Sequence, residues 1–239
     1  GVNGDTRETL FFNNCYWIFN LQTAADIARV LGKAEDAKKY ADRADEVRRA
    51  VHREFFIPGV NSYVNGFQAY LAIALLVDLP PQDVRPFIER RLEEEILIRR
   101  KGHIHAGITG GAFLFKTLLA LDRQDLIYTM ANKTTYPGWG DMLRTGATSI
   151  YESWDMDNSL CHSSYLYIGT WFIEGLAGIK TDLQSPGFQR FVLKPGIVDD
   201  PSLTWVKANY DSLYGRIVSN WKIDDAGVLT WNVTVPPNT

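Results

Sequence analysis

The chain of 239 residues carries 25 Lys and Arg against 28 Asp and Glu, a net charge of -3, and 46% of its residues are hydrophobic. This composition can build a large core and excludes a disordered protein. No basic stripe could neutralise a phosphate backbone, so we expect no nucleic-acid partner. The longest apolar run, 70–77, is far too short to cross a bilayer, so we expect no membrane partner.

Apolar residues recur at helical spacing up to about residue 177 and predict about seven or eight helices. The second of them carries a dense charged face, which we interpret as a solvated surface with i,i+4 ion pairs. Trp171 falls in the last helical pattern and is expected in the core. The predicted helices before the last one are Thr9–Leu31, the charged second helix Ala34–Phe56, Phe67–Val77, Gln82–Arg100, one capped by Thr109 or Gly110 and ending at Leu121, and Asp125–Asn132.

The pattern changes near residue 188 to short alternating segments of β-branched and aromatic residues, bounded by Gly, Pro, Asp and Ser. Tyr214-Gly215 and 225–227 are typical of hairpin loops. These features predict an antiparallel β-sandwich, or part of one. We place the boundary near Gly178–Pro186, with a helical domain over 1–180 and the β domain over 181–239. The predicted strands lie within 188–195, 203–212, 215–225 and 227–237.

Helix pairs without interleaved strands favour an all-α toroid or bundle over an α/β barrel. The helices are too few to close an (α/α)6 barrel, so we expect only its later half. The chain opens without Met and ends on a strand-like segment. We therefore expect a piece of a longer protein.

The stretch 134–180 concentrates residues suited to a sugar site. Three of the chain's seven Trp lie there, and Glu152 and Asp155 flank Trp154, with His162 shortly after. Pyranose rings present apolar C–H faces that lie well on aromatic rings, and hydroxyl groups that need charged or amide partners. This composition indicates carbohydrate binding.

Histidine and cysteine do not indicate a metal site. His103 and His105 lie in a loop that enters a helix, where a ligand could be met, but no third ligand accompanies them. We therefore favour a structural or substrate-contact role over metal binding. Cys15 and Cys161 show no CxxC spacing and are expected to be two buried thiols, neither a disulfide nor a zinc site.

Several segments together resemble the C-terminal part of bacterial α-L-rhamnosidases of glycoside hydrolase family 78. They are GWGDMLRTGATSIYESWD, SLCHSSYLYIGTWFIEGLAGI, SPGFQRFVLKPG, WVKANYDSLYGRIVSNW and VTVPPNT. The resemblance spans nearly the whole chain, in the family's order. It implies an (α/α)6 catalytic barrel followed by a β-sandwich, and hydrolysis of terminal α-L-rhamnose with inversion of configuration.

Inverting hydrolysis needs two carboxyl groups about 6.5–9.5 Å apart, one as acid and one as base. By motif position Glu152 resembles the family's general base, and His162 resembles its contact to a sugar hydroxyl. Trp139 and Trp154 are then expected to wall the pocket. Asp155 and His103 are further expected substrate contacts, and no cofactor is needed.

The sequence departs from the family where the general acid is expected. The Arg- and Glu-containing, Asp-rich segment that carries the acid is not found, and Asp5 is not assigned to that role. Only 156–158 separate the ExWD and SLxH elements, and Tyr151 stands where the family often has Trp. We therefore expect the acid in an N-terminal segment outside this chain, and poor catalysis by the isolated chain.

Two alternatives stay open at this point. One is another (α/α)6 glycosidase, such as a glucosidase of the trehalase type. The other is a noncatalytic fragment whose aromatic residues bind sugar without turnover. Compartment, aglycone preference and oligomeric state are left open by the sequence.

Overall fold

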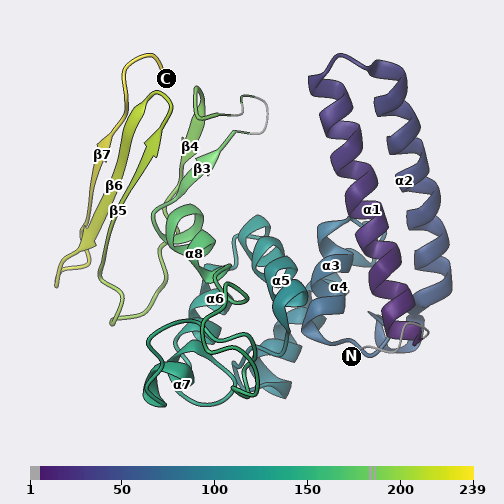
Figure 1. Ribbon diagram of the computed structural model, residues 1–239, viewed down its shortest axis with the longest axis horizontal. Coiled ribbons are helices and arrows are strands. Elements are labelled where there is room, and N and C mark those ends of the chain that lie inside the picture. Colours follow the sequence, from purple (N-terminus) through teal and green to yellow (C-terminus); the bar gives the residue numbers. More distant parts are fainter. Residues whose placement is uncertain (1–5, 183–184, 186) are drawn as a thin grey trace. The chain divides into compact units, whose positions relative to one another are not determined.

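The computed structural model describes residues 6–182, 185 and 187–239. The chain is mainly α with antiparallel strands at its C-terminal end, which confirms the expected fold class (Figure 1). It divides into two compact units, one reaching to Thr117 and including 135–138, the other formed by 118–134 and 139–239. Asp5 and part of the expected domain boundary, at 183, 184 and 186, lie outside the described residues. The boundary at 180 stays a prediction.

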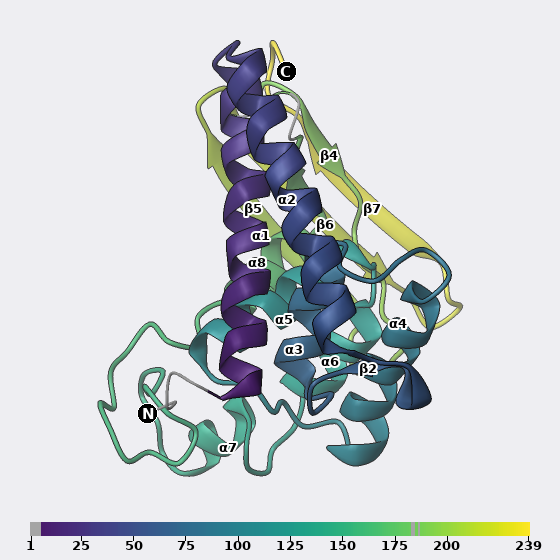
Figure 2. The same cartoon turned by 90° about the vertical axis from the view of Figure 1, so that its right-hand side faces the viewer.

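The first unit begins with a long helical hairpin. Helix α1 (Arg7–Val30) starts after Thr6, whose side chain caps it by accepting a hydrogen bond from the Thr9 amide at 3.2 Å. Gly32, with φ of +70°, turns the chain into α2 (Ala34–Phe55). The two helices lie side by side in both views (Figures 1 and 2). Both predicted helices are confirmed to within two residues at each end.

A small aromatic core closes one end of this hairpin. The short strands β1 (Phe56–Ile57) and β2 (Ser62–Tyr63) pair antiparallel around the turn η1 (Pro58–Val60). Tyr63 is fully buried and its ring stacks on Phe11 of α1 at 5.3 Å between centroids. The long-range contact fixes the position of the loop that follows α2.

The remaining helices of the first unit are shorter. They are α3 (Gln68–Leu76), α4 (Arg85–Glu94) with its π-helical continuation η2 (Glu95–Arg99), and α5 (Ile108–Ala120). Gln68 is fully buried, donates to the His103 carbonyl at 2.9 Å and accepts from the His105 amide at 2.8 Å. One buried amide side chain therefore anchors the loop that enters α5.

The second unit contains α6 (Gln124–Ala131), α7 (Trp139–Arg144) and α8 (Ile168–Thr170), which continues as the π-helix η3 (Trp171–Leu176). Trp171 is 3% exposed and its indole N–H donates to Gln124 Oε1 at 2.9 Å. Its expected place in the core is confirmed.

Two small antiparallel sheets follow η3. Ile179 of β3 (Ile179–Thr181) and Ile217 of β6 (Gly215–Ile223) share a buried cluster with Ala177. Trp221 of β6 is 2% exposed and donates to the Leu176 carbonyl at 2.8 Å, so the sheet is attached directly to the end of η3. The strands are β3 (Ile179–Thr181) paired with β4 (Phe191–Leu193), and β5 (Trp205–Ser212), β6 (Gly215–Ile223) and β7 (Leu229–Thr234) in that order.

Both predicted hairpin loops and the four predicted strands are confirmed, whereas β3 was not predicted. This strand has only three residues, and it pairs with β4 across a connection of nine residues. The expectation of two buried thiols is wrong for Cys161, which is exposed on a loop, while Cys15 is buried. Of the helices in the described residues, none combines the length and apolar character needed to span a bilayer.

Candidate functional site

Most candidate site residues of the second unit lie on the loop that follows α7, and Trp139 begins that helix. This helix ends at Arg144 because Gly146 adopts φ of +90°, and the amides of Gly146 and Ala147 satisfy carbonyls of the last turn. The chain then runs without regular structure from 147 to 167. Loops held on a fixed framework commonly carry binding and catalytic side chains.

Two backbone hydrogen bonds hold the arms of this loop together. The Glu152 amide donates to the Ser159 carbonyl at 2.9 Å, and the His162 amide donates to the Ile150 carbonyl at 2.7 Å. The carboxylate of Glu152 is also held, because the Ser159 amide donates to Oε2 at 3.3 Å. Glu152 and His162 therefore stand on facing arms of one loop, with Glu152 half-buried.

The rings of Trp139, Trp154, Tyr165 and Tyr167 form an aromatic cluster beside this loop. Trp154 stacks on Tyr165, with centroids 3.8 Å apart, and meets Trp139 edge-on at 5.1 Å. Trp139 also meets Tyr167 edge-on at 5.9 Å, and its indole N–H donates to the Tyr165 carbonyl at 3.2 Å. Burial raises the pKa of Tyr167 above its ordinary range, so its hydroxyl stays protonated.

Tyr165 and Tyr167 are not among the site residues predicted from the sequence. A signal was present, because the two tyrosines alternate directly after the histidine motif, in SSYLYIG. Alternation alone does not tell which partner a ring will meet. The structure supplies that partner, since both rings contact the tryptophans that were predicted.

The remaining predicted polar residues of this unit occupy different environments. Asp155 is exposed, and hydrogen bonding from the Ser153 side chain lowers its pKa, so the carboxylate is ionised at neutral pH. His162 is exposed, and its Nδ1 lies 3.0 Å from the Ser164 amide nitrogen and 2.5 Å from the Ser164 hydroxyl. The second unit thus gathers five of the six predicted site residues on one loop and its neighbouring helix.

His103 belongs to the first unit, and both of its ring nitrogens are engaged there. Nδ1 lies 3.0 Å from the Arg100 carbonyl, and Nε2 lies 2.8 Å from the Thr135 hydroxyl. Because a carbonyl can only accept, Nδ1 carries the proton and Nε2 accepts from Thr135 when the ring is neutral. Its expected contact with substrate stays a prediction.

Metal ligands are not gathered in the part of the chain that the structure describes, where no group of three His, Cys, Asp or Glu side chains could hold an ion. His105, considered above with His103, instead packs edge-on against Phe67 at 5.0 Å.

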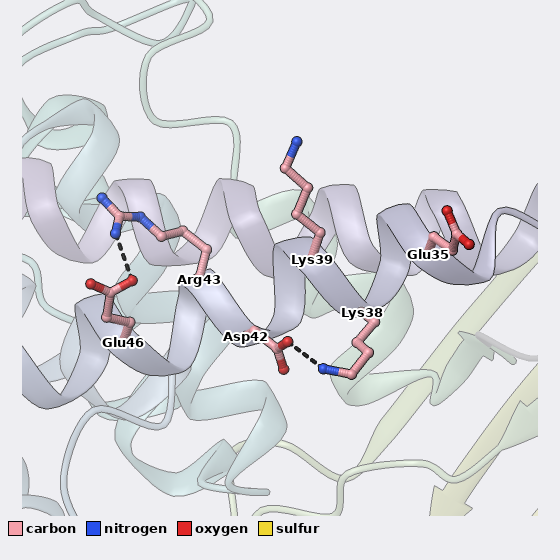
Figure 3. A pocket seen from close by; sticks show the side chains of 6 residues that line it. All are labelled: Glu35, Lys38, Lys39, Asp42, Arg43 and Glu46. Atoms are coloured by element: carbon pink, nitrogen blue, oxygen red, sulfur yellow. Dashed lines mark hydrogen bonds and ion pairs between the residues drawn. The ribbon is translucent and has the colours of Figure 1, made fainter.

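Two hollows differ in their chemical character. One, of about 660 Å³, runs along α2 and is lined only by charged side chains (Figure 3). Lys38–Asp42 and Arg43–Glu46 pair along that helix, as expected for a solvated face, and nothing converges on a ligand. The other hollow, of about 470 Å³, lies in the second unit. Its lining is mainly apolar and includes Trp139, and Lys133 is one of its few polar residues. An apolar lining with few polar groups is the usual character of a ligand pocket.

Two family models match the chain. The bacterial alpha-L-rhamnosidase 6 hairpin glycosidase domain matches residues 1–176, and the bacterial alpha-L-rhamnosidase C-terminal domain matches residues 178–239. The chain belongs to the bacterial α-L-rhamnosidase family. The resemblance seen in the sequence motifs is thereby confirmed.

Individual α-L-rhamnosidases are similar to this chain over nearly its whole length. An alpha-L-rhamnosidase of Formosa agariphila is 30% identical over 247 residues, covering 99% of this chain and 26% of that protein. The structure of the α-L-rhamnosidase from Dictyoglumus thermophilum matches 94% of this chain and 26% of that one, with a TM-score of 0.84 and 26% identity. The chain therefore spans about a quarter of the length of these relatives.

A solved structure of a rhamnosidase with sugar is also similar. The Streptomyces avermitilis α-L-rhamnosidase complexed with L-rhamnose matches at a TM-score of 0.84 and 26% identity, covering 95% of this chain and 22% of that one. That relative binds L-rhamnose. Binding of L-rhamnose by the protein that contains the present rhamnosidase family chain is a proposal.

Proposed function

We propose that the protein containing this chain is an inverting α-L-rhamnosidase, which removes terminal α-L-rhamnose from rhamnosides with Glu152 as the general base. The observation that carries the proposal is the hold on the Glu152 carboxylate by the Ser159 amide, on a loop that also carries His162 and Trp154. A fixed carboxylate beside aromatic rings fits the needs of a base acting on bound sugar.

In the proposed reaction Glu152 takes a proton from a water molecule, and the water oxygen attacks the anomeric carbon. The bond from that carbon to the leaving oxygen breaks, and the leaving oxygen receives a proton from the general acid. The two carboxyl groups of such enzymes stand about 6.5–9.5 Å apart, which leaves room for the water. We assign the acid to a part of the protein outside these residues, because the family segment that carries it is not found in this sequence.

The other predicted residues are proposed to hold the sugar. The aromatic cluster, through Trp154 and Trp139, offers an apolar surface for the C–H face of the rhamnose ring. His162 is proposed to donate to a sugar oxygen, and the ionised Asp155 to accept from a hydroxyl. His103, in the first unit, is proposed as a separate substrate contact, which accepts from a sugar hydroxyl in place of Thr135. No cofactor is assigned, because water and two carboxyl groups suffice.

The test compares nitrophenol release from p-nitrophenyl α-L-rhamnoside by full-length wild-type protein and its Glu152→Gln variant. We expect the variant to lose about 10²–10⁴-fold in rate, the usual contribution of a positioned base. Azide should restore nitrophenol release and give β-L-rhamnosyl azide, because the anion attacks from the face that the base served. The anomeric configuration of the azide product is read by proton NMR.

Asp155→Asn is the matched control, since it removes a neighbouring exposed carboxylate on the same loop. We expect it to lower the rate by less than about tenfold, as for one lost substrate hydrogen bond. Unchanged activity in Glu152→Gln, or an azide product of α configuration, would remove Glu152 from the mechanism. A wild-type protein that releases no nitrophenol from the rhamnoside would overturn the proposed substrate.

A further inference from the structure

Ser164 contacts one ring nitrogen of His162. Ser164 is only 5% exposed, although His162 and Ser163 beside it are exposed. Its backbone amide lies 3.0 Å from His162 Nδ1, and its hydroxyl lies 2.5 Å from the same nitrogen. Both groups of one buried residue therefore meet a single ring nitrogen of an exposed one.

This contact determines which nitrogen of His162 carries the proton. A backbone amide can only donate, so Nδ1 must accept, and in the neutral ring the proton lies on Nε2. His103 shows the opposite arrangement, because its Nδ1 faces the Arg100 carbonyl and must itself carry the proton. The two histidines are thus set to different tautomers by their backbone neighbours.

Ser164 is in turn held by the aromatic cluster. The next residue, Tyr165, is 3% exposed and its ring stacks on Trp154. The Tyr165 carbonyl accepts from the Trp139 indole at 3.2 Å. The ring and the carbonyl of Tyr165 are therefore both anchored, and this fixes the direction of the preceding backbone at Ser164.

We propose that Ser164 is a positioning residue that sets His162 as an Nε2–H donor toward an oxygen of the bound sugar. This inference rests on the proposed function, because it assigns the sugar to the same loop. It adds that the histidine acts as a donor from one defined nitrogen, and that the aromatic cluster sets its orientation through Ser164.

The kinetic test uses a pair of His162 variants in the full-length protein with p-nitrophenyl α-L-rhamnoside. In Gln the side-chain amide nitrogen can occupy the place of Nε2, whereas in Asn the amide lies near the place of Nδ1. We expect His162→Gln to keep KM within about threefold of wild type and His162→Asn to raise KM about tenfold. A pair in which Asn performs as well as Gln would overturn the Nε2 donor.

Ser164→Ala removes the hydroxyl and keeps the amide. We expect it to raise KM about 2–10-fold with kcat within about twofold, because one hydrogen bond that orients the ring is lost. Ser163→Ala, at the exposed neighbour, is the matched control and should change neither constant. The Ser164 effect should disappear when Ser164→Ala is combined with His162→Gln, since the Gln has no Nδ1 to orient.

A spectroscopic test needs no substrate. In protein labelled with ¹⁵N-histidine, the His162 signals are assigned by their loss in His162→Gln. In the neutral ring we expect an unprotonated-type shift for Nδ1 and a protonated-type shift for Nε2. The reverse pattern would overturn the tautomer, whatever the substrate. If the protein proves inactive on rhamnosides, the proposed function fails, while this measurement still decides the tautomer of His162.

Discussion

The indole of Trp154 lies nearly parallel to the ring of Tyr165, with 3.8 Å between the centroids and 22° between the planes. Trp139 meets the same indole edge-on at 5.1 Å. Stacked and edge-on pairs of this kind each contribute about 0.5–1.5 kcal/mol beyond the burial of area. The half-buried indole is thus fixed in orientation by two neighbours, as the proposed sugar platform requires.

Replacing Trp154 should therefore affect activity more than its exposure suggests. We expect Trp154→Ala to lower kcat/KM on p-nitrophenyl α-L-rhamnoside by about 10²-fold. The variant loses the ring surface proposed to contact the sugar, and the Tyr165 ring loses its stacking partner. Trp154→Phe should recover part of this loss. The constants are measured by nitrophenol release in the full-length protein.

Trp205 provides the control for that variant. It is 59% exposed on β5 in the same unit, so Trp205→Ala removes an indole without touching the aromatic cluster. We expect kcat/KM to stay within about twofold of wild type. Equal losses in the two alanine variants would indicate that Trp154 acts only through the stability of the unit.

The two hydrogen bonds of the His103 ring lead to a separate prediction. Thr135→Val removes the hydroxyl at Nε2 and leaves the bond between Nδ1 and Arg100 in place. If a sugar hydroxyl replaces Thr135 on Nε2, this variant should keep KM or lower it by up to about threefold, because no internal bond must be broken. His103→Ala should raise KM about tenfold. An equal rise of KM in both variants would make His103 an anchor for Thr135 instead.

Gly175 is expected to tolerate no side chain. A Cβ atom at this position would lie 2.3 Å from Trp171 Cδ1 and 2.7 Å from Gln124 Oε1, inside the buried contact between η3 and α6. We expect Gly175→Ala to lower the free energy of unfolding by about 1–3 kcal/mol or more, as measured by urea denaturation.

Gly169 is the matched position for this test. It lies on α8, and a Cβ atom there would meet nothing within 4 Å. Gly169→Ala should leave stability unchanged or raise it by about 0.5–1 kcal/mol, because alanine loses less backbone entropy in a helix. A similar loss in both variants would contradict the assigned steric cause.

Because of His52, we expect the folded protein to lose stability in mild acid. Its Nδ1 lies 2.7 Å from the hydroxyl of the fully buried Tyr63, and burial lowers the pKa of His52 below its ordinary value. Burial also raises the pKa of Tyr63, so its hydroxyl keeps its proton and can donate to Nδ1 of the neutral His52 ring. Protonation of His52 would remove that acceptor.

The sign of the effect follows from these directions. The unfolded chain takes up the proton at about pH 6.5, before the folded protein does, so the free energy of unfolding falls as pH drops below that value. In His52→Asn, whose side chain does not titrate, the fall in melting temperature between pH 7.5 and 5.5 should be smaller than in wild type. An identical fall in both proteins would contradict the role of His52.

Local features could be predicted well from the sequence. The helices α1 and α2, the hairpin loops before β6 and β7, and the core position of Trp171 depend on periodicity and turn residues that lie close together along the chain. Glu152 and His162 were recognised by short motifs. The errors lie where tertiary contacts decide, as with the exposure of Cys161.

The sequence by itself determined the family, the helical part followed by strands, and the stretch in which most of the candidate residues lie. The tertiary structure alone decided that Tyr165 and Tyr167 join Trp139 and Trp154, and that Ser164 meets His162 through Nδ1. The physical reason is that periodicity records which residues prefer burial or a given backbone. Which ring or hydrogen-bonding atom each one meets depends on how the irregular loop closes on itself.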